Sequence, residues 1–516
     1  MRLALGPAAA VLASSMLLCS AAPAGPLAAV PGGALAAAST GPLAAAGVVA
    51  VQPARPPGVP PPVDGQSQPS ALDAERNIPF DNSLPGKRQV RGPRVGTDRG
   101  CVAAGDLPEP VEPSPWGQTR LRFDELRRFA TGEGQVVAVI DTGVTPHPRL
   151  AGRLRDGGDY LQGTSALQDC DGHGTLVAGI IAAADDESTG FTGIAPGAQI
   201  LSIRQSTGVL EVRYLDEAKG QQFEERSAGN TTSLALAVVR AVALGATVIN
   251  ISEAACFPAA PDQVNGSDLQ AAVHFAVESN VVVVAAAGNA DEASRCRPAN
   301  DPGRQPVTVA SPAWFDDDVL AVGAVGEDGE PAAFTLAGPW VDVAAPGTEV
   351  VSLDPVPGSG RLTNFMATAQ GQGPIQGTSF ATPYVAGLAA LIRQRFPELT
   401  ARQVMARIEQ TALQSPGRDR HQDTLGSGMI DPVAALTDVL PQEHGSTPPP
   451  PQSGTLDNLV PQPRKDPVPT RVALAGAGAG LLALAVTGFA VYTVQHARTR
   501  RRWAATTDQH PATGDP

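Results

Sequence analysis

Short apolar runs alternate with longer segments of helical periodicity between residues 116 and 440 of the chain. Short runs rich in Val, Ile and Ala are typical of strands buried on both faces. They predict strands at residues 136–140, 200–203, 248–251, 281–286, 319–322 and 340–343. The longer segments predict helices at residues 176–184, 234–244, 269–277, 379–396 and 400–413, the last beginning with a capping box of Thr400 and Gln403. This alternation predicts an α/β fold, a mostly parallel sheet flanked by helices on both faces.

Two polar stretches interrupt this pattern. Residues 205–230 are charged and contain glycine, and residues 354–376 are rich in Gly, Pro and Gln. Both are predicted to be loops between core elements. They are either variable surface loops without a function or loops that shape a cleft or dock a partner. The second alternative is considered because loops often carry function.

The N-terminal part of the chain has the features of an exported protein. Residues 1–24 resemble a signal peptide, with Arg2, an apolar stretch and a small-residue cleavage site at residues 22–24. Cys19 offers lipidation as an alternative, although Leu18 stands where a lipobox has a small residue. Residues 25–115 combine a low-complexity segment, which lacks the bulk for a core, with an N-terminal extension. The extension contains Cys101 and is predicted to be an extended arm on the domain that follows.

The C-terminal part predicts a membrane anchor. Residues 441–471 are a proline-rich linker, and residues 472–494 form an uncharged, mostly apolar stretch long enough for a transmembrane helix. Four arginines follow within residues 498–502, whereas Arg471 is the single basic residue at the other flank. The positive-inside rule then puts the tail, residues 495–516, in the cytoplasm and residues 116–440 outside.

Charge and cysteine content narrow the class of protein. A net charge of −14 argues against a nucleic-acid partner. Removal of the signal peptide leaves Cys101, Cys170, Cys256 and Cys296. An even number of cysteines in an exported chain indicates two disulfides, with three possible connectivities. A zinc site is the alternative, but the spacings contain no C-x-x-C pair.

The candidate chemistry centres on the sequence GTSFATP at residues 377–383. Gly377 allows a sharp turn, and Pro383 fits the first turn of the helix that follows. Ser379 therefore lies at a helix N-terminus, where free N–H groups and the helix dipole stabilise negative charge. By itself, a serine at this position is either a helix cap or a nucleophile.

Three other residues favour the nucleophile. Asp141 ends the first predicted strand, His173 opens a helical run, and Asn289 follows the predicted strand 281–286. Taken singly, they would be a turn cap, a loop residue and a turn residue. In chain order, however, Asp141, His173 and Ser379 match one of the three known orders of a catalytic triad.

With their flanking residues, these motifs resemble the subtilisin-like serine peptidases over residues 116–440. Four phrases are most similar to the mycosins, the membrane-anchored subtilases of type VII secretion systems. They are VIDTGVTPHP (139–148), SIRQ (202–205), AGPWVD (337–342) and GMIDPVAAL (428–436). The order of signal peptide, protease, proline linker and membrane helix agrees with that family.

The resemblance implies a role for each site residue. Asp141, His173 and Ser379 would be the triad, and Asn289 would donate its side-chain amide to the oxyanion. Residues 252–254 and 285–287 would bind substrate as an added strand. The substrate-binding residues would be Ser252, Ala254, Ala287 and Gly288. Glu253 either favours a basic substrate side chain or is a solvated surface carboxylate. This chemistry needs no metal or cofactor, and no acidic cluster has the spacing of calcium ligands.

The resemblance also implies a disulfide pairing and a location. In a subtilase sheet the strands that precede Cys256 and Cys296 are neighbours, which implies the pairs Cys256–Cys296 and Cys101–Cys170. The protein would be an extracytoplasmic serine endopeptidase anchored in the cell membrane, acting on protein or peptide substrates with a type VII secretion complex. The alternatives are a scaffold of that complex with secondary proteolysis, or a general surface processing subtilase.

Overall fold

The computed structural model describes residues 59–61, 63, 88–93, 101, 113–161, 165–216, 222–259, 266–290, 296–368, 371–413, 422–444, 484 and 486–498. The predicted signal peptide and most of the predicted linker, membrane helix and tail lie outside these residues. Residues 486–498 are helical. Within the described ranges, no helix combines the length and apolar character needed to cross a bilayer.

A seven-stranded sheet forms the core, and every neighbouring pair of strands is parallel. In spatial order the strands are β12 (Val343–Pro346), β11 (Leu320–Val325), β9 (Val282–Ala286), β7 (Val248–Ile251), β2 (Val136–Asp141), β4 (Gln199–Arg204) and β3 (Leu154–Asp159). The residues of β7 and β9 are buried at every position. Both strands are therefore apolar apart from Asn250 in β7, because helices cover both faces of the sheet.

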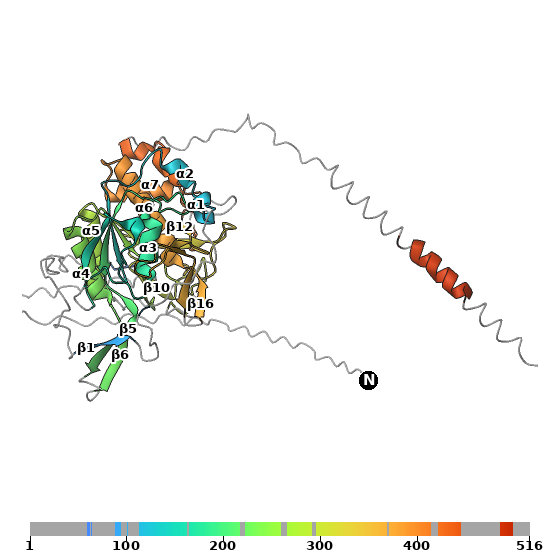
Figure 1. The fold of residues 1–516 in the computed structure, drawn as a ribbon, viewed down its shortest axis with the longest axis horizontal. Helices are drawn as coiled ribbons and strands as arrows, with labels where there is room; N and C mark the ends of the chain where they lie inside the picture. The colour runs from blue at the N-terminus through green and yellow to red at the C-terminus, as the bar shows by residue number, and fades with distance from the viewer. Residues whose placement is uncertain are drawn as a thin grey trace, which may run out of the picture. The chain divides into compact units, whose positions relative to one another are not determined.

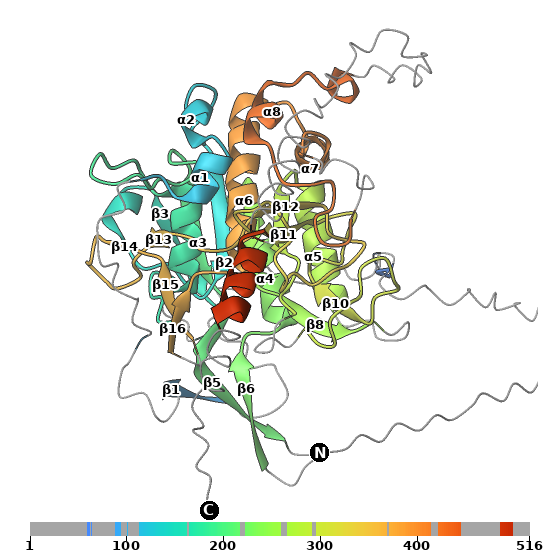
Figure 2. The ribbon, with the colours of Figure 1, turned by 90° about the vertical axis from the view of Figure 1, so that its right-hand side faces the viewer.

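Helices α3 (His173–Ala182) and α6 (Thr378–Arg395) pack on one face of the sheet, and α4 (Thr231–Ala243) and α5 (Ser267–Glu278) pack on the other (Figures 1 and 2). Helix α7 (Ala401–Gln410) packs against α5 and α6. It begins with the expected capping box of Thr400 and Gln403. The remaining helices are α1 (Trp116–Arg120), α2 (Phe123–Leu126), α8 (Pro432–Thr437) and the short 3-10 helices η2 (Pro148–Leu150) and η4 (Pro441–His444).

The predicted parallel sheet with helices on both faces is confirmed, but two strand assignments need correction. Trp340 lies in a turn over residues 338–341, in which the Val341 N–H donates to the Gly338 carbonyl at 3.1 Å, and the strand begins only at Val343. Trp340 is buried, so its apolar character reflects packing in the turn. Strand β3 has no counterpart among the predictions, because its sequence LRDGGD contains a single large apolar residue at the edge of the sheet.

The prediction of a loop at residues 205–230 is wrong. Strands β5 (Thr207–Asp216) and β6 (Gln222–Ala228) form an antiparallel hairpin, and β1 (Arg88–Pro93) from the N-terminal extension pairs with β5 (Figure 2). A small antiparallel sheet need not bury both of its faces, so its strands can contain charged residues. These strands therefore lack the apolar run by which the core strands were predicted.

The stretch 354–376 is also more regular than predicted. Strand β14 (Leu362–Thr363) pairs with β13 (Ser352–Leu353), and β15 (Phe365–Thr368) pairs with β16 (Gly371–Pro374) just before the start of α6. Two-residue strands are too short to produce a readable alternation of polar and apolar residues. A separate pair, β8 (Ala255–Pro258) with β10 (Thr308–Ser311), lies beyond β7.

The segment that precedes the peptidase domain, residues 25–115, contacts the domain at three described points. The Gln270 side chain on α5 donates to the Pro61 carbonyl at 2.5 Å, β1 pairs with β5, and Cys101 is joined to Cys170. The second disulfide joins Cys256 to Cys296. Both pairs are those that the family resemblance implies.

Loss of the Cys256–Cys296 bond should destabilise the domain and slow turnover. The bond closes a loop over a sequence separation of 40, so the chain-entropy model gives roughly 4 kcal/mol of stability. A Cβ at Gly288 would lie 3.4 Å from the Cys296 sulfur, so the bond supports the turn that holds Asn289. Equilibrium unfolding in urea of the Cys256→Ser/Cys296→Ser protein measures the first effect, and kcat measures the second. Unchanged values for both would contradict this role.

Candidate active site

The candidate site residues gather at the carboxyl ends of the central strands. Asp141 is the last residue of β2, and Ser252 directly follows β7, the neighbour of β2. From β2 the chain first builds the side of the sheet that contains β4 and β3, and then adds β7, β9, β11 and β12 on the other side. In open parallel sheets, such a reversal of strand order leaves a crevice at the carboxyl ends, where ligands bind.

Asp141 and His173 form a buried hydrogen-bonded pair, although 32 positions separate them in the chain. The His173 Nδ1 atom lies 2.7 Å from Asp141 Oδ1, and the backbone N–H of Thr142 donates to the same oxygen at 2.7 Å. Asp141 is fully buried, whereas 18% of the His173 side chain is exposed. One end of the imidazole is therefore fixed by a carboxylate while the ring keeps some access to the crevice.

Two glycines allow β2 and α3 to lie close enough for the Asp141–His173 hydrogen bond. A Cβ at Gly174 would lie 2.1 Å from the Gly143 carbonyl oxygen and 3.1 Å from the Asp141 Cβ. Gly143 itself has φ 109°, a conformation that disfavours any side chain. The glycines that flank Asp141 and His173 in the sequence are thus required by the contact between β2 and α3.

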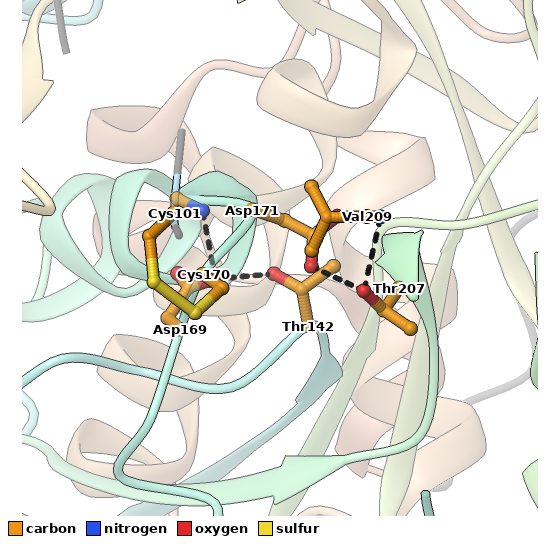
Figure 3. Close-up of a disulfide and its surroundings, with 8 residues drawn as sticks. Cys101, Thr142, Asp169, Cys170, Asp171, Thr207 and Val209 are labelled. Atoms are coloured by element: carbon orange, nitrogen blue, oxygen red, sulfur yellow. Dashed lines mark hydrogen bonds between the residues drawn. A yellow bond between two sulfur atoms is a disulfide. The ribbon is translucent and has the colours of Figure 1, made fainter. Parts of the chain in front are cut away.

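Asp169 organises the start of α3, a role that sequence reasoning missed. Figure 3 shows it beside Thr142 and the Cys101–Cys170 disulfide. Its Oδ1 accepts hydrogen bonds from the Thr142 hydroxyl and the Gly172 N–H, each at 2.8 Å. Its Oδ2 accepts from the Thr175 N–H at 2.8 Å and from the Thr175 hydroxyl at 2.6 Å. Burial raises the pKa of Asp169 to about 6, although the Thr175 hydrogen bonds lower it. The sequence offered one sign of this role, an acidic residue four positions before His173. The hydrogen-bond partners of Asp169 could be identified only from the tertiary structure.

Ser379 is the second residue of α6, which begins one residue before the predicted start at Ser379. Gly377, just before the helix, has φ 147°, which favours glycine at this sharp turn. The Ser252 hydroxyl donates to the Ser379 carbonyl at 2.7 Å, and the next residue, Phe380, packs its ring against His173 with centroids 5.0 Å apart. Among the described residues of the site, the Ser379 hydroxyl forms no hydrogen bond with His173. In enzymes without bound substrate, the bond between nucleophile and base is often long and shortens only when substrate binds.

The Asn289 side chain is oriented by the same helix start. Its Oδ1 accepts hydrogen bonds from the N–H and the hydroxyl of Thr378, each at 3.0 Å. Its amide nitrogen would lie 3.2 Å from a Cβ at Gly377. The amide therefore presents its nitrogen to the turn that immediately precedes Ser379.

The remaining predicted binding residues lie on two neighbouring strand ends. Ser252 is buried and Ala254 is exposed. Ala287 is buried and donates its N–H to the Val322 carbonyl at 3.0 Å, and Gly288 has φ 101°. Glu253 is half-buried and accepts a hydrogen bond from the Ser206 hydroxyl. The prediction that it is a solvated surface carboxylate is therefore wrong.

Negative charge dominates the surroundings of His173. Burial lowers the pKa of His173, but the charge and hydrogen bond of Asp141 outweigh it and raise that pKa to about 9. Burial, and then the charge of Asp141, raise the pKa of Glu253 to about 7. Burial also raises the pKa of Asp171, which accepts hydrogen bonds from Thr207 and Gly208 at 2.6 Å each. Across the described parts of the chain, no group of three or more metal-ligating side chains comes together.

A family model for the subtilase family matches residues 132–428 of the chain. Mycosin-4 of Mycobacterium tuberculosis is 48% identical over 380 residues, which cover 71% of this chain and 79% of the relative. Mycosin-3 of the same organism is 39% identical and covers 86% of this chain and 93% of the relative. The chain belongs to the mycosin family of subtilases. The predicted family is thus confirmed.

Solved mycosins have the same fold. The crystal structure of MycP1 from the ESX-1 type VII secretion system matches with a TM-score of 0.64 at 36% identity, covering 74% of this chain and 96% of that one. A chain in the structure of an intact ESX-5 inner membrane complex matches with a TM-score of 0.63 at 36% identity, covering 84% of this chain and 99% of that one. The structural similarity therefore extends over nearly the full length of these two solved chains.

Proposed function

We propose that this mycosin is a membrane-anchored, extracytoplasmic serine endopeptidase that acts with a type VII secretion system. The hydrogen-bonded Asp141–His173 pair carries the proposal, because it lies beside the helix start that presents Ser379. Ser379 is the nucleophile, His173 the general base and Asp141 the group that orients the imidazole. A buried carboxylate, an imidazole and a serine hydroxyl are the groups that perform acyl transfer in Ser-His-Asp triads.

The reaction proceeds through an acyl-enzyme. His173 takes the proton of the Ser379 hydroxyl as the oxygen attacks the scissile carbonyl, and later returns a proton to the leaving amine. The buried charge of Asp141, 2.7 Å from Nδ1, holds the tautomer that leaves Nε2 able to accept a proton and stabilises the imidazolium that forms. Water then hydrolyses the acyl-enzyme by the same route in reverse.

Asn289→Ala should lower kcat by roughly 10²–10³-fold, the range for loss of one oxyanion donor. The mutation removes the amide nitrogen near the Ser379 turn, whose orientation depends on the two bonds from Thr378. Steady-state kinetics with a fluorogenic peptide measure the loss. Asn289→Asp is the matched control: it can still accept the Thr378 bonds but cannot donate, so it should be similarly impaired. If Asn289→Asp retained wild-type kcat, the donor role would be refuted.

Activity should keep rising above neutral pH. His173 must be neutral to act as a base, and its raised pKa moves the rising limb of kcat/KM to the alkaline side of 6.5. The groups that face the ring and raise its pKa are Asp141, Glu253 and Asp169. Glu253→Gln removes one of these charges, so it should move the midpoint to lower pH. A wild-type midpoint at or below pH 6.5 would contradict this assignment.

The link to secretion rests on the relatives. A chain similar to this one occurs in an intact ESX-5 inner membrane complex, which also supports the scaffold alternative. A deletion strain complemented with wild type or with Ser379→Ala separates the two roles. Secretion restored only by wild type means that proteolysis is required. Secretion restored by both means that the protein acts mainly as a scaffold, and secretion restored by neither version would oppose the association with this system.

The domain organisation is part of the proposal. Residues 1–24 are the signal peptide, residues 116–440 the peptidase domain, residues 441–471 a proline-rich linker and residues 472–494 the membrane anchor. Proline-rich spacers expose their backbone to proteases, whereas a folded body does not. Mild proteolysis of intact cells should therefore release the catalytic domain by cleavage between residues 441 and 470. Release only from disrupted cells would contradict the outward topology.

A further inference from the structure

A pocket of about 400 Å³ lies beside the candidate active site. Its walls are residues 205–208, the start of α4 and the edge segment 253–257. Glu253 is the one charged residue among the described residues that line it. Ser252, the preceding residue, donates to the Ser379 carbonyl, so the pocket adjoins the proposed nucleophile along the same strand end.

The walls suit the stem of a long side chain. Leu234 is buried and Phe257 half-buried, and both contribute apolar surface. Two of the neutral polar side chains around them, Gln205 and Asn230, are already engaged within the protein. The Gln205 amide donates to the Asn230 carbonyl at 3.0 Å and to the Ser233 hydroxyl at 2.8 Å, and Asn230 caps α4.

Unlike these neutral groups, the Glu253 carboxylate carries a charge that the pocket only partly compensates. It accepts a hydrogen bond from Ser206, and within the described part of the chain no arginine or lysine side chain pairs with it. Besides burial, the negative charges of Asp141 and Asp171 raise its pKa, so they disfavour its ionised form. A cation that entered the pocket would relieve this repulsion and pair with a carboxylate that is partly shielded from water.

We propose that Glu253 is a specificity-determining residue that selects substrates with a lysine or arginine upstream of the scissile bond. The inference rests on the proposed peptidase function. A substrate that adds as a strand along residues 252–254 directs alternate side chains to one side, and this pocket lies on one such side. The methylenes of a basic side chain lie along Leu234 and Phe257 while its charged end reaches Glu253.

The test uses peptides that differ only by lysine or norleucine at the second, third or fourth residue before the scissile bond. At one of these positions we expect wild type to prefer lysine by roughly tenfold in kcat/KM at pH 9, where Glu253 is ionised. Glu253→Gln should reduce that preference to within about twofold, whereas Glu278→Gln, a change of an exposed carboxylate on α5, should leave it unaltered. The ratio within one variant cancels any effect of Glu253 on His173.

A second readout does not depend on turnover. Calorimetric binding of the two peptides to Ser379→Ala and to Ser379→Ala/Glu253→Gln should show the same loss of preference. Equal preference for lysine with and without Glu253, or no preference in wild type, overturns the inference and leaves the peptidase function standing. If wild type cleaves no peptide in a Ser379-dependent manner, the proposed function fails and the inference fails with it.

Discussion

Ser379→Ala should abolish peptide hydrolysis and leave the domain folded. The contacts described for Ser379 are made by its backbone: its carbonyl accepts the Ser252 hydroxyl, and its position at the start of α6 depends on Gly377. Removal of the hydroxyl therefore takes away the nucleophile without a structural contact. We expect kcat to fall by about 10⁶-fold, the loss seen when the serine of a subtilisin triad is removed.

The structural and catalytic parts of this expectation are measured separately. Thermal unfolding should give the same midpoint for wild type and Ser379→Ala, and a fluorogenic peptide assay should show the loss of turnover. The double variant with His173→Ala should lose little more than either single variant, because the two side chains act as one unit. A Ser379→Ala protein that cleaved at the wild-type rate would refute the nucleophile assignment.

Asp141→Asn should lower kcat by about 10⁴-fold, the effect of the same change in a convergent Ser-His-Asp triad on an unrelated fold. Asp141 Oδ1 holds the His173 Nδ1–H at 2.7 Å, and an amide can instead donate to Nδ1 and stabilise the wrong tautomer. The change also removes the largest charge that raises the pKa of His173. The variant should therefore keep its fold, lose turnover and show a lower His173 pKa by NMR titration.

Asp185→Asn is a suitable control, because Asp185 is an exposed carboxylate paired with Arg127. It should retain wild-type activity and a wild-type His173 pKa. If Asp141→Asn also left kcat unchanged, Asp141 would not be the group that orients His173, and its hydrogen bond at the end of β2 would be structural.

Much of the fold could be predicted because buried parallel strands and covering helices have strong local patterns. Strand β7 was predicted with its observed bounds, because three of the four residues in its sequence VINI are apolar and β-branched. The candidate site was also largely visible, because its chemistry constrains neighbouring residues. Gly143 and Gly174 have to be glycine for β2 and α3 to approach each other. These required glycines make the motifs around Asp141 and His173 recognisable in the sequence.

The elements missed by the sequence patterns depend on contacts between distant residues. Strand β3 lies at the edge of the sheet, and the β5–β6 hairpin belongs to a small sheet completed by a strand from the N-terminal extension. Neither needs an uninterrupted apolar run, so periodicity alone does not reveal them.

The sequence by itself determined the family, the order of the candidate triad and the parallel α/β core, because these features require specific residue types at fixed local positions. Only the tertiary structure decided how Asp169 supports the start of α3 and that Glu253 is half-buried in a pocket beside the site. Burial, hydrogen-bond partners and the sum of nearby charges arise from segments far apart in the chain. They set the protonation and orientation of the side chains on which the proposed chemistry depends.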